Sequence, residues 1–225
     1  HTDFYCTNLP GAGNVLLLNQ GDGTYVDQAV PAGVRSWLLG WGTLFLDYDN
    51  DSYLDLYVCN LGPNRLYDND LQWPCPDVAP ELDLDTEVYS HCVAAGDIEG
   101  DGDLDLLVQG FGVPAQLFVN HEGSRRNWLE VEAFGASANT QGVGARVVVR
   151  AGERTQYREI RAGVGFKSSN SLVAHFGLGE AVLIDEVRIE WPWGGNTVLN
   201  DIAVNQRIAV CEGGRVYQPR SLVPR

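Results

Sequence analysis

The chain has 225 residues, 44% of them hydrophobic, and a formal charge of −15 at pH 7, so it can bury the core of one large domain or of two smaller ones. Lys167 is the only lysine and no basic patch occurs, which argues against nucleic acid or an anionic membrane surface as a partner. No apolar run approaches the length needed to cross a bilayer, so we expect no membrane span.

The first part of the chain repeats a pattern of short strands. Three similar segments lie fifty and fifty-one residues apart: Asn14–Asn19, Asn64–Asn69 and Ala115–Asn120. A hairpin-turn signal, Gly21–Tyr25, follows the first. Two further predicted strands, Gly40–Phe45 and His91–Ala95, each precede an acidic loop. Each unit therefore predicts strand, acidic loop, strand, turn and strand, with no helical period.

The two acidic loops, residues 47–55 and 97–105, lie fifty residues apart and carry acids at positions 1, 3, 5 and 9. Each runs directly into an apolar strand. Carboxylates packed this densely repel one another unless a cation lies among them, and Ca²⁺ accepts several carboxylates together with a backbone carbonyl. We therefore predict about two Ca²⁺ ions. The predicted ligands are Asp47, Asp49, Asp51, Tyr53 (through its carbonyl) and Asp55 in the first loop, and Asp97, Glu99, Asp101, Asp103 and Asp105 in the second.

The alternative is a pair of solvated acidic turns, since Asp and Asn are common in turns. Two loops in register favour the metal site. The sixth position calls for a sharp turn, which Gly102 supplies without steric cost. Ser52 does not supply such a turn, so we expect a weaker or distorted first loop. At position 3 of the second loop, Glu99 has a longer side chain than Asp49 of the first loop, so we expect it to bind differently.

The five cysteines follow no metal or redox spacing. Together with a calcium-type motif they predict disulfides formed in an oxidising compartment. The favoured pairs are Cys75 with Cys92 and Cys6 with Cys59, which leaves Cys211 as a free thiol.

Residues 10 to 122 resemble the FG-GAP/VCBS repeats of integrin-like β-propellers and of many secreted bacterial proteins. The resemblance is carried by the loops from Asp47 to Asp55 and from Asp97 to Asp105, with the departures at Ser52 and Glu99. It implies blade-like sheets with Ca²⁺ bound in the hairpin between two strands. We count about two blades, fewer than a closed propeller needs, so the array is expected to pack on the second region, on upstream blades or on another copy.

From Asn127 the acidic loops stop and alternating strand patterns take over, which favours a sandwich or barrel. The predicted strands are Trp128–Glu132, Ala145–Arg150, Thr155–Ile160, Val187–Trp191 and Gln206–Val210. The fold class is therefore all-β, with partial propeller-like blades followed by a C-terminal sandwich or barrel. The expected domains are residues 1–125 and 126–214, with a tail at 215–225 whose last residues, 221–225, look like the remnant of an expression tag.

The second part resembles the ASPIC/UnbV domain of cartilage-acidic-protein-like (CRTAC) proteins. The matching segments are Asn127–Leu129, Gly142–Arg146, Arg158–Ile160, Gly163–Asn170, His175–Gly179 and Glu190–Gly195. This resemblance implies no established activity.

No catalytic constellation stands out. His91, His121 and His175 are scattered, and Ser168 and Ser169 lack a nucleophile elbow. His175 is interpreted as a packed or hydrogen-bonding strand residue. A glycosidase-like pair of acids stays open.

Two other groups of residues admit a binding interpretation. Trp191 and Trp193 are open to two interpretations, a ligand-stacking surface and, more simply, core or turn residues. The arginines at 146, 150, 158 and 161 could contact an acidic glycan, although local salt bridges are the simpler account.

The leading hypothesis is a noncatalytic, secreted or periplasmic calcium-binding protein that mediates adhesion, assembly or matrix contacts, with Ca²⁺ rigidifying its hairpins. Its expected partner is a protein or glycan at a cell surface or in a matrix, or another copy of the chain. The rival hypothesis is a carbohydrate-binding or carbohydrate-processing module. A third is that the acidic surface serves salt tolerance.

Overall fold

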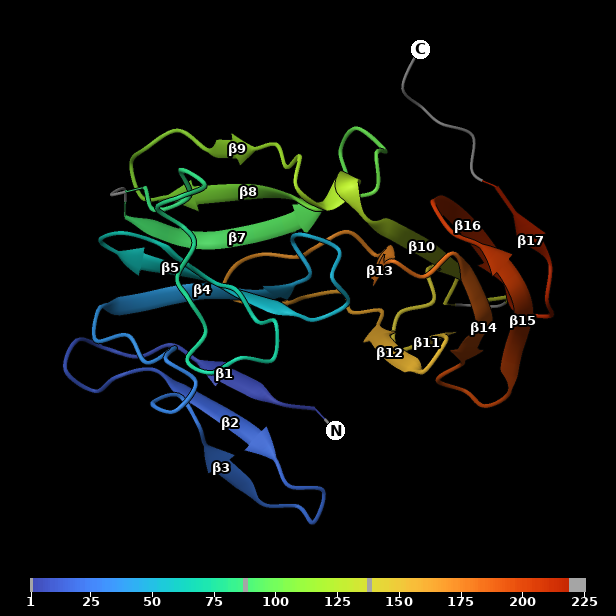
Figure 1. Ribbon diagram of the computed structural model, residues 1–225, viewed down its shortest axis with the longest axis horizontal. Helices are drawn as coiled ribbons and strands as arrows, with labels where there is room; N and C mark the ends of the chain where they lie inside the picture. The colour runs from blue at the N-terminus through green and yellow to red at the C-terminus, as the bar shows by residue number, and fades with distance from the viewer. Residues whose placement is uncertain (1, 87–88, 137–138, 219–225) are drawn as a thin grey trace.

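The computed structural model describes residues 2–86, 89–136 and 139–218 and is built from seventeen strands in five sheets (Figure 1). The one helical segment within these ranges is the short 3₁₀ turn η1, Gly123–Arg125. None of the helices in the described ranges is long and apolar enough to cross a membrane. The all-β prediction is confirmed.

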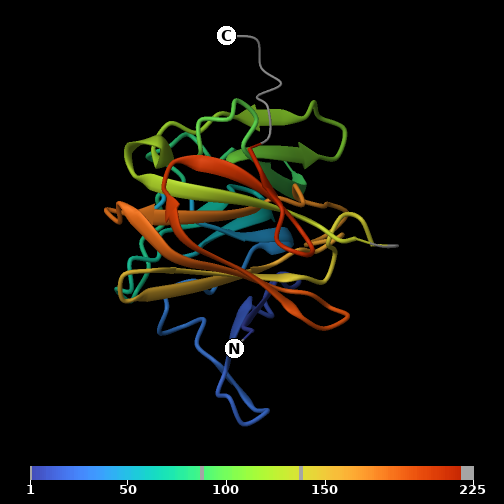
Figure 2. The same ribbon diagram turned by 90° about the vertical axis from the view of Figure 1, so that its right-hand side faces the viewer.

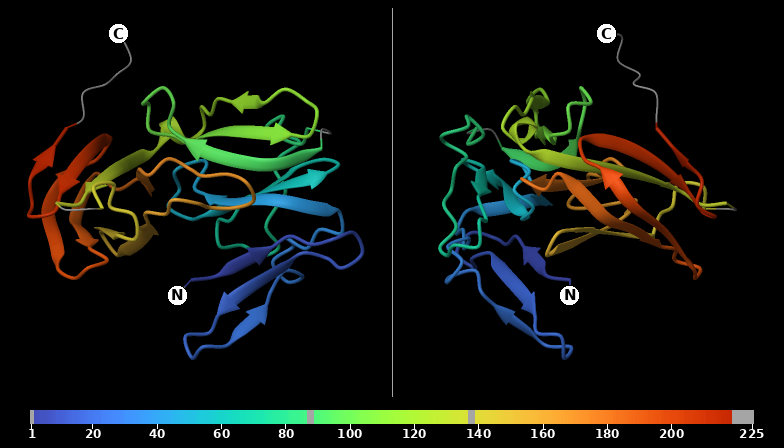
Figure 3. Two further views of the ribbon diagram at one scale, coloured as in Figure 1. Left: turned by 180° about the vertical axis from the view of Figure 1, so that it is seen from behind. Right: turned by 45° about the vertical axis from the view of Figure 1, so that its right-hand side comes forward.

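Three antiparallel three-stranded sheets form the first part of the chain. They comprise β1 (Phe4–Cys6), β2 (Val15–Asn19) and β3 (Tyr25–Asp27), then β4 (Leu39–Leu46), β5 (Asp55–Leu61) and β6 (Arg65–Tyr67), then β7 (Ser90–Gly96), β8 (Asp105–Gly110) and β9 (Gln116–Phe118). The sheets follow one another in space in chain order, as the view from behind also shows (Figure 3). The acidic loops are the β4–β5 and β7–β8 connections.

The count of about two blade-like units was too low, because β1–β3 form a third sheet. The backbone nitrogen of Asn8 bonds the side chain of Asn14 at 2.9 Å, as that of Asn60 bonds Asn64 at 3.0 Å. Strands β1 and β2 therefore correspond to β5 and β6. The first sheet represents the later part of a repeat, and no acidic loop accompanies it among residues 2–27.

Apolar side chains on alternate faces of the strands join neighbouring sheets. Leu56 and Val58 of β5 face the first sheet, where they pack with Tyr5 and Leu16. Tyr57 and Cys59 point to the other face and pack with residues of β7 and β8. This alternation follows from the two-residue period of a strand.

The predicted disulfides are wrong, since all five cysteines are free. Cys6 is exposed because its neighbour Tyr5 occupies the core side of β1, whereas Cys59 is buried on the far face of β5. Cys75 packs in the core between the first two sheets, and Cys92 lies on β7 with its thiol 3.9 Å from the carbonyl of Gln109. Cys211, predicted to be a free thiol, is free, as are the other four cysteines.

Two four-stranded sheets pack face to face to form the C-terminal sandwich, which faces the viewer in Figure 2. One has the order β13-β10-β16-β17 and the other β12-β11-β14-β15. The strands are β10 (Asn127–Phe134), β11 (Arg146–Ala151), β12 (Arg154–Glu159), β13 (Ala174–Gly179), β14 (Leu183–Glu190), β15 (Asn196–Ala203), β16 (Gln206–Cys211) and β17 (Val216–Tyr217).

The sandwich core joins Leu129, Val131 and Phe176 of the first sheet to Val147 and Ile189 of the second. The five strands expected in this half all occur, and β13, β15 and β17 are additional. Val216 and Tyr217, assigned to a tail from the sequence, pair with β16. The expected tag remnant, residues 221–225, lies outside the described residues.

Candidate metal centre

The two acidic loops share one backbone conformation. At position 4, Asn50 and Gly100 have φ of +60° and +76°, and at position 6, Ser52 and Gly102 have φ of +83° and +93°. Ser52 therefore adopts a left-handed conformation that glycine reaches without strain. The first loop keeps the same turn as the second at the cost of backbone strain.

The first loop gathers three of its predicted ligands. Asp47, Asp49 and Asp55 each offer a carboxylate oxygen, and these oxygens lie within 4.8 Å of one another. Asp55 accepts bonds from the backbone nitrogens of Tyr48 (3.0 Å) and Asn69 (2.8 Å). Asp51 is outside this group and accepts a 2.7 Å bond from the backbone nitrogen of Tyr53.

Asp47 supplies a direct sign that a cation fits this loop. Its side chain is buried; one carboxylate oxygen accepts a 3.0 Å bond from the backbone nitrogen of Ser52, and the other, Oδ1, has no hydrogen-bond partner. A buried, unpartnered carboxylate oxygen beside two further carboxylates is costly unless a positive charge lies there. The donor set is all oxygen, as Ca²⁺ prefers.

Burial and neighbouring acids raise the pKa values of this loop. Burial, and then the charge of Asp51, raises the pKa of Asp47 to about 7. Burial raises the pKa of Asp55 to about 9 and also raises the pKa of Asp51. Without a cation, the native protein therefore keeps Asp47 and Asp55 at least partly protonated near neutral pH.

Two arginines of the C-terminal half, one before β10 and one on β12, contact the first loop. Arg126 forms an ion pair with the Asp49 carboxylate and donates a 3.0 Å bond to the Asp49 carbonyl. Arg154 of β12 lies 3.6 Å above the Tyr53 ring and donates to the Ser52 carbonyl at 3.3 Å. These contacts attach the loop to the sandwich and offset part of its negative charge.

The second loop arranges its acids differently. Asp97 accepts bonds from the backbone nitrogens of Gly100 (2.6 Å), Asp101 (3.2 Å) and Gly102 (3.1 Å). Asp105 accepts from Ile98 (2.8 Å) and Asn120 (2.9 Å), as Asp55 does from its equivalents. Its neighbour Asp103 is fully buried and has one unpartnered oxygen, Oδ1.

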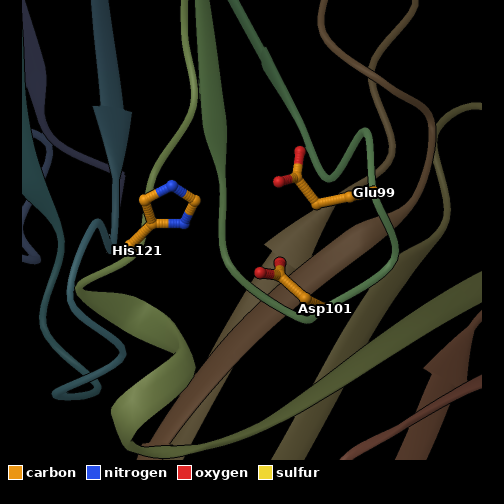
Figure 4. Close-up of side chains that lie close together, drawn as sticks. All are labelled: Glu99, Asp101 and His121. Atoms are coloured by element: carbon orange, nitrogen blue, oxygen red, sulfur yellow. The ribbon is translucent and has the colours of Figure 1, made fainter.

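A histidine that sequence reasoning did not place joins this loop. Glu99, Asp101 and His121 have ligand atoms within 4.8 Å of one another, with His121 contributed by the segment after β9 (Figure 4). The available signal was the repeat itself: His121 follows Asn120 as Asp70 follows the equivalent Asn69.

The sandwich closes over the second loop. The Nε2 atom of His175, on β13, lies 3.0 Å from the Gly102 carbonyl, and burial lowers the pKa of His175 to about 4. The interpretation of His175 as a packed, hydrogen-bonding strand residue is confirmed.

The tryptophan pair does not form an open stacking platform. Trp191 lies in the sandwich core and donates a 3.1 Å bond to Thr197, whereas Trp193 is 43% exposed and stacks on it with the ring centroids 5.7 Å apart. Three of the four highlighted arginines form local ion pairs: Arg146 and Arg161 with Glu159, and Arg150 with Asp185.

Comparison with known families agrees with this architecture. Residues 47–108 match the FG-GAP-like repeat, and residues 135–216 match the ASPIC and UnbV family. The chain thus combines one segment that matches the FG-GAP-like repeat with a second that matches the ASPIC and UnbV family. It is homologous to Cartilage acidic protein 1: it is 27% identical to the mouse and human proteins over 281 aligned positions and 26% identical to the Xenopus tropicalis protein over 263.

These alignments cover 94% of the chain for the mouse and human relatives and 86% for the frog relative. The chain spans 42% of the length of the mouse and human proteins and 40% of the frog protein.

Proposed function

We propose that this chain is a noncatalytic, calcium-binding part of a secreted or extracytoplasmic protein that makes adhesion, assembly or matrix contacts. The observation that carries the proposal is the unpartnered, buried Oδ1 of Asp47 beside the carboxylates of Asp49 and Asp55. FG-GAP-like repeats commonly bind calcium, and the oxygen-only donor set of the first loop suits that ion.

The residues that would hold calcium are Asp47, Asp49, Asp51, Tyr53 and Asp55 in the first loop, with the corresponding acids at 97 to 105 in the second. The bound ion supplies positive charge among acids that otherwise repel one another. It would rigidify the β4–β5 and β7–β8 hairpins, which also contact the sandwich.

Calcium would make stability depend on the surroundings. Extracellular calcium sites commonly have dissociation constants of roughly 10⁻⁴ to 10⁻³ M. At a free concentration about ten times that constant, linkage contributes about 1.4 kcal/mol per site. The free energy of unfolding of a typical domain is roughly 5 to 15 kcal/mol, so one site contributes a useful fraction of it.

The adhesion or matrix role is supported by the homology to Cartilage acidic protein 1, a protein named for a tissue rich in matrix. The partner we propose is a protein or glycan of such a matrix or of a cell surface. The noncatalytic assignment is supported by the setting of most acids with raised pKa values, which lie in the two loops where a cation would hold them. Burial also raises the pKa of Glu130 on β10, and that carboxylate forms an ion pair with Arg207 at 3.8 Å.

The decisive experiment measures bound calcium and thermal stability together. Chelator should lower the melting temperature, and Ca²⁺, but not Mg²⁺, should restore it. Asp47→Asn should remove about one bound Ca²⁺ per chain, since it keeps the acceptor for the Ser52 nitrogen but loses the charge. The control is Asp83→Asn, an exposed residue outside the loops whose φ of +55° asparagine tolerates. Equal calcium stoichiometry in the two variants would contradict the metal assignment.

The contact role is tested separately with the purified chain on immobilised matrix proteins and glycans, with and without chelator. Binding that requires Ca²⁺ supports the proposal. Glycan binding or turnover that survives neutral substitution of both loops would instead favour the carbohydrate module.

A further inference from the structure

A histidine lies beside the second acidic loop, whereas the corresponding position beside the first loop is an aspartate. Glu99 and Asp101 come from the β7–β8 connection and His121 from the segment after β9, and their ligand atoms lie within 4.8 Å of one another. In Figure 4 the three side chains approach the same space from the two segments. Glu99 and His121 are exposed, so an ion from solution can reach them.

The other acids of this loop are already engaged. Both oxygens of Asp97 accept backbone nitrogens of the loop, and both oxygens of Asp105 accept the nitrogens of Ile98 and Asn120. Glu99 accepts no hydrogen bond that the described residues provide. Asp101 accepts a long one, 3.4 Å, from the Asp103 nitrogen, and its carboxyl also lies within hydrogen-bonding reach of the Asp103 carboxyl. Glu99 and Asp101 are therefore the carboxylates with most free coordinating capacity.

A second, independent observation points to a cation here. Asp103 is fully buried, and its Oδ1 atom has no hydrogen-bond partner. Its Oδ2 atom accepts the Ser124 nitrogen at 3.1 Å, which fixes the carboxylate in place two residues after Asp101. The Asp103 carboxyl lies against that of Asp101, so the two acids together carry negative charge that a bound ion would balance.

The two loops differ in the donors they present. In the first, Asp49 is paired with Arg126, and Asp70 stands at the repeat position that His121 occupies in the second. In the second, the residue at Asp49's position, Glu99, faces an imidazole. Imidazole nitrogen suits Zn²⁺ and other first-row transition ions, whereas an all-oxygen set suits Ca²⁺ and Mg²⁺.

We propose that Glu99, Asp101 and His121 form a mixed nitrogen–oxygen site for a divalent transition-metal ion of the Zn²⁺ type, which displaces Ca²⁺ from the second loop when both ions are present. The proposal deepens the proposed function, because it rests on the second loop being a cation site, but it does not depend on calcium in the first loop. Three protein ligands leave open positions for water or for a side chain of a partner.

The test is a calorimetric titration of the full chain with Zn²⁺ in a buffer that contains saturating Ca²⁺, combined with NMR of the histidine ring nitrogens. The wild type should bind about one Zn²⁺ that shifts the His121 ring resonances. His121→Ala and Glu99→Gln should each weaken Zn²⁺ binding at least about tenfold. His121→Asp should lose Zn²⁺ binding while its Ca²⁺ binding is kept or strengthened.

Two further variants separate this proposal from the previous one. His91→Ala removes a histidine outside the cluster and should leave Zn²⁺ binding unchanged. Asp47→Asn should lose one Ca²⁺ and keep Zn²⁺, which would show that the two loops bind independently. Zn²⁺ binding that is equal in the wild type and in His121→Ala, or absent from the wild type, would overturn the proposal whatever the calcium stoichiometry.

Discussion

The side-chain amide of Asn50, in the first acidic loop, donates a 2.9 Å hydrogen bond to the carbonyl of Gly102 in the second loop. The same amide donates a second 2.9 Å bond to the carbonyl of Gly123, at the turn that leads into the sandwich. Asn50 is fully buried, and its backbone carbonyl accepts a 2.8 Å hydrogen bond from the backbone nitrogen of Gly179 in β13. One residue thus connects both candidate metal loops to the C-terminal sandwich.

Replacing Asn50 with glycine should destabilise the protein by about 1 to 3 kcal/mol, because the buried carbonyls of Gly102 and Gly123 each lose a donor. Glycine keeps the left-handed backbone at this position, so the change isolates the side chain. Chemical denaturation measures the loss, with the exposed, left-handed Asp201→Gly as the control. A loss no larger than that of the control would mean that the amide does not couple the loops.

Ser52 and Gly102 occupy the same turn position but should respond to substitution in opposite ways. Ser52→Gly relieves a φ of +83° and should raise the free energy of unfolding by about 1 kcal/mol. Gly102→Ala should lower it by about 2 to 3 kcal/mol, because a Cβ there would overlap the Trp128 indole as well as strain the backbone. Thermal denaturation in Ca²⁺ compares the two variants, and a loss in Ser52→Gly would show that its hydroxyl or packing outweighs the strain.

Calcium stabilisation should increase with pH. The pKa values of Asp47 and Asp55 are raised to about 7 and about 9, above those of the unfolded chain, so without metal the native state retains protons that the unfolded chain has released. The free energy of unfolding of the metal-free protein therefore falls as the pH rises through these values. Ca²⁺ must displace the same protons, so it binds more weakly in acid.

The measurement is the difference in melting temperature with and without Ca²⁺ across this range. The difference should be small at about pH 6 and clearly larger at about pH 8. In Asp47→Asn, which cannot release this proton, the pH dependence should flatten. A difference that is constant with pH in the wild type would separate calcium binding from these carboxyls.

Equivalent positions in neighbouring sheets should also differ in their energetic weight. Tyr57 of β5 is fully buried beneath the third sheet, whereas Leu107, fifty residues later on β8, is 47% exposed because no described segment covers that face. Tyr57→Ala should cost about 3 to 5 kcal/mol, and Leu107→Ala less than about 1 kcal/mol. Comparable losses in denaturation would indicate that Leu107 is covered in solution, for example by a second copy of the chain.

Much of the local structure follows from the sequence. Period-two alternation located five of the sandwich strands, and the carboxylate spacing located both acidic loops. These features depend on neighbouring residues, whose spacing reflects backbone geometry directly. The first sheet was missed as a unit because β1 and β3 have three residues each, too few to show a period.

The cysteine pairs show the limit of such reasoning. Spacing alone does not tell which face of a strand a thiol occupies, and Cys6 and Cys59 lie on faces that do not meet. The tertiary structure also decided that His121 joins Glu99 and Asp101, that Arg126 neutralises Asp49 and that Asn50 reaches Gly102. The sequence by itself determined the strands and the two acid-rich turns. Only the tertiary structure decided which charged side chains lie beside those turns. These side chains come from segments that are distant along the chain and meet where sheets pack together, and such packing leaves no periodic signal in the sequence.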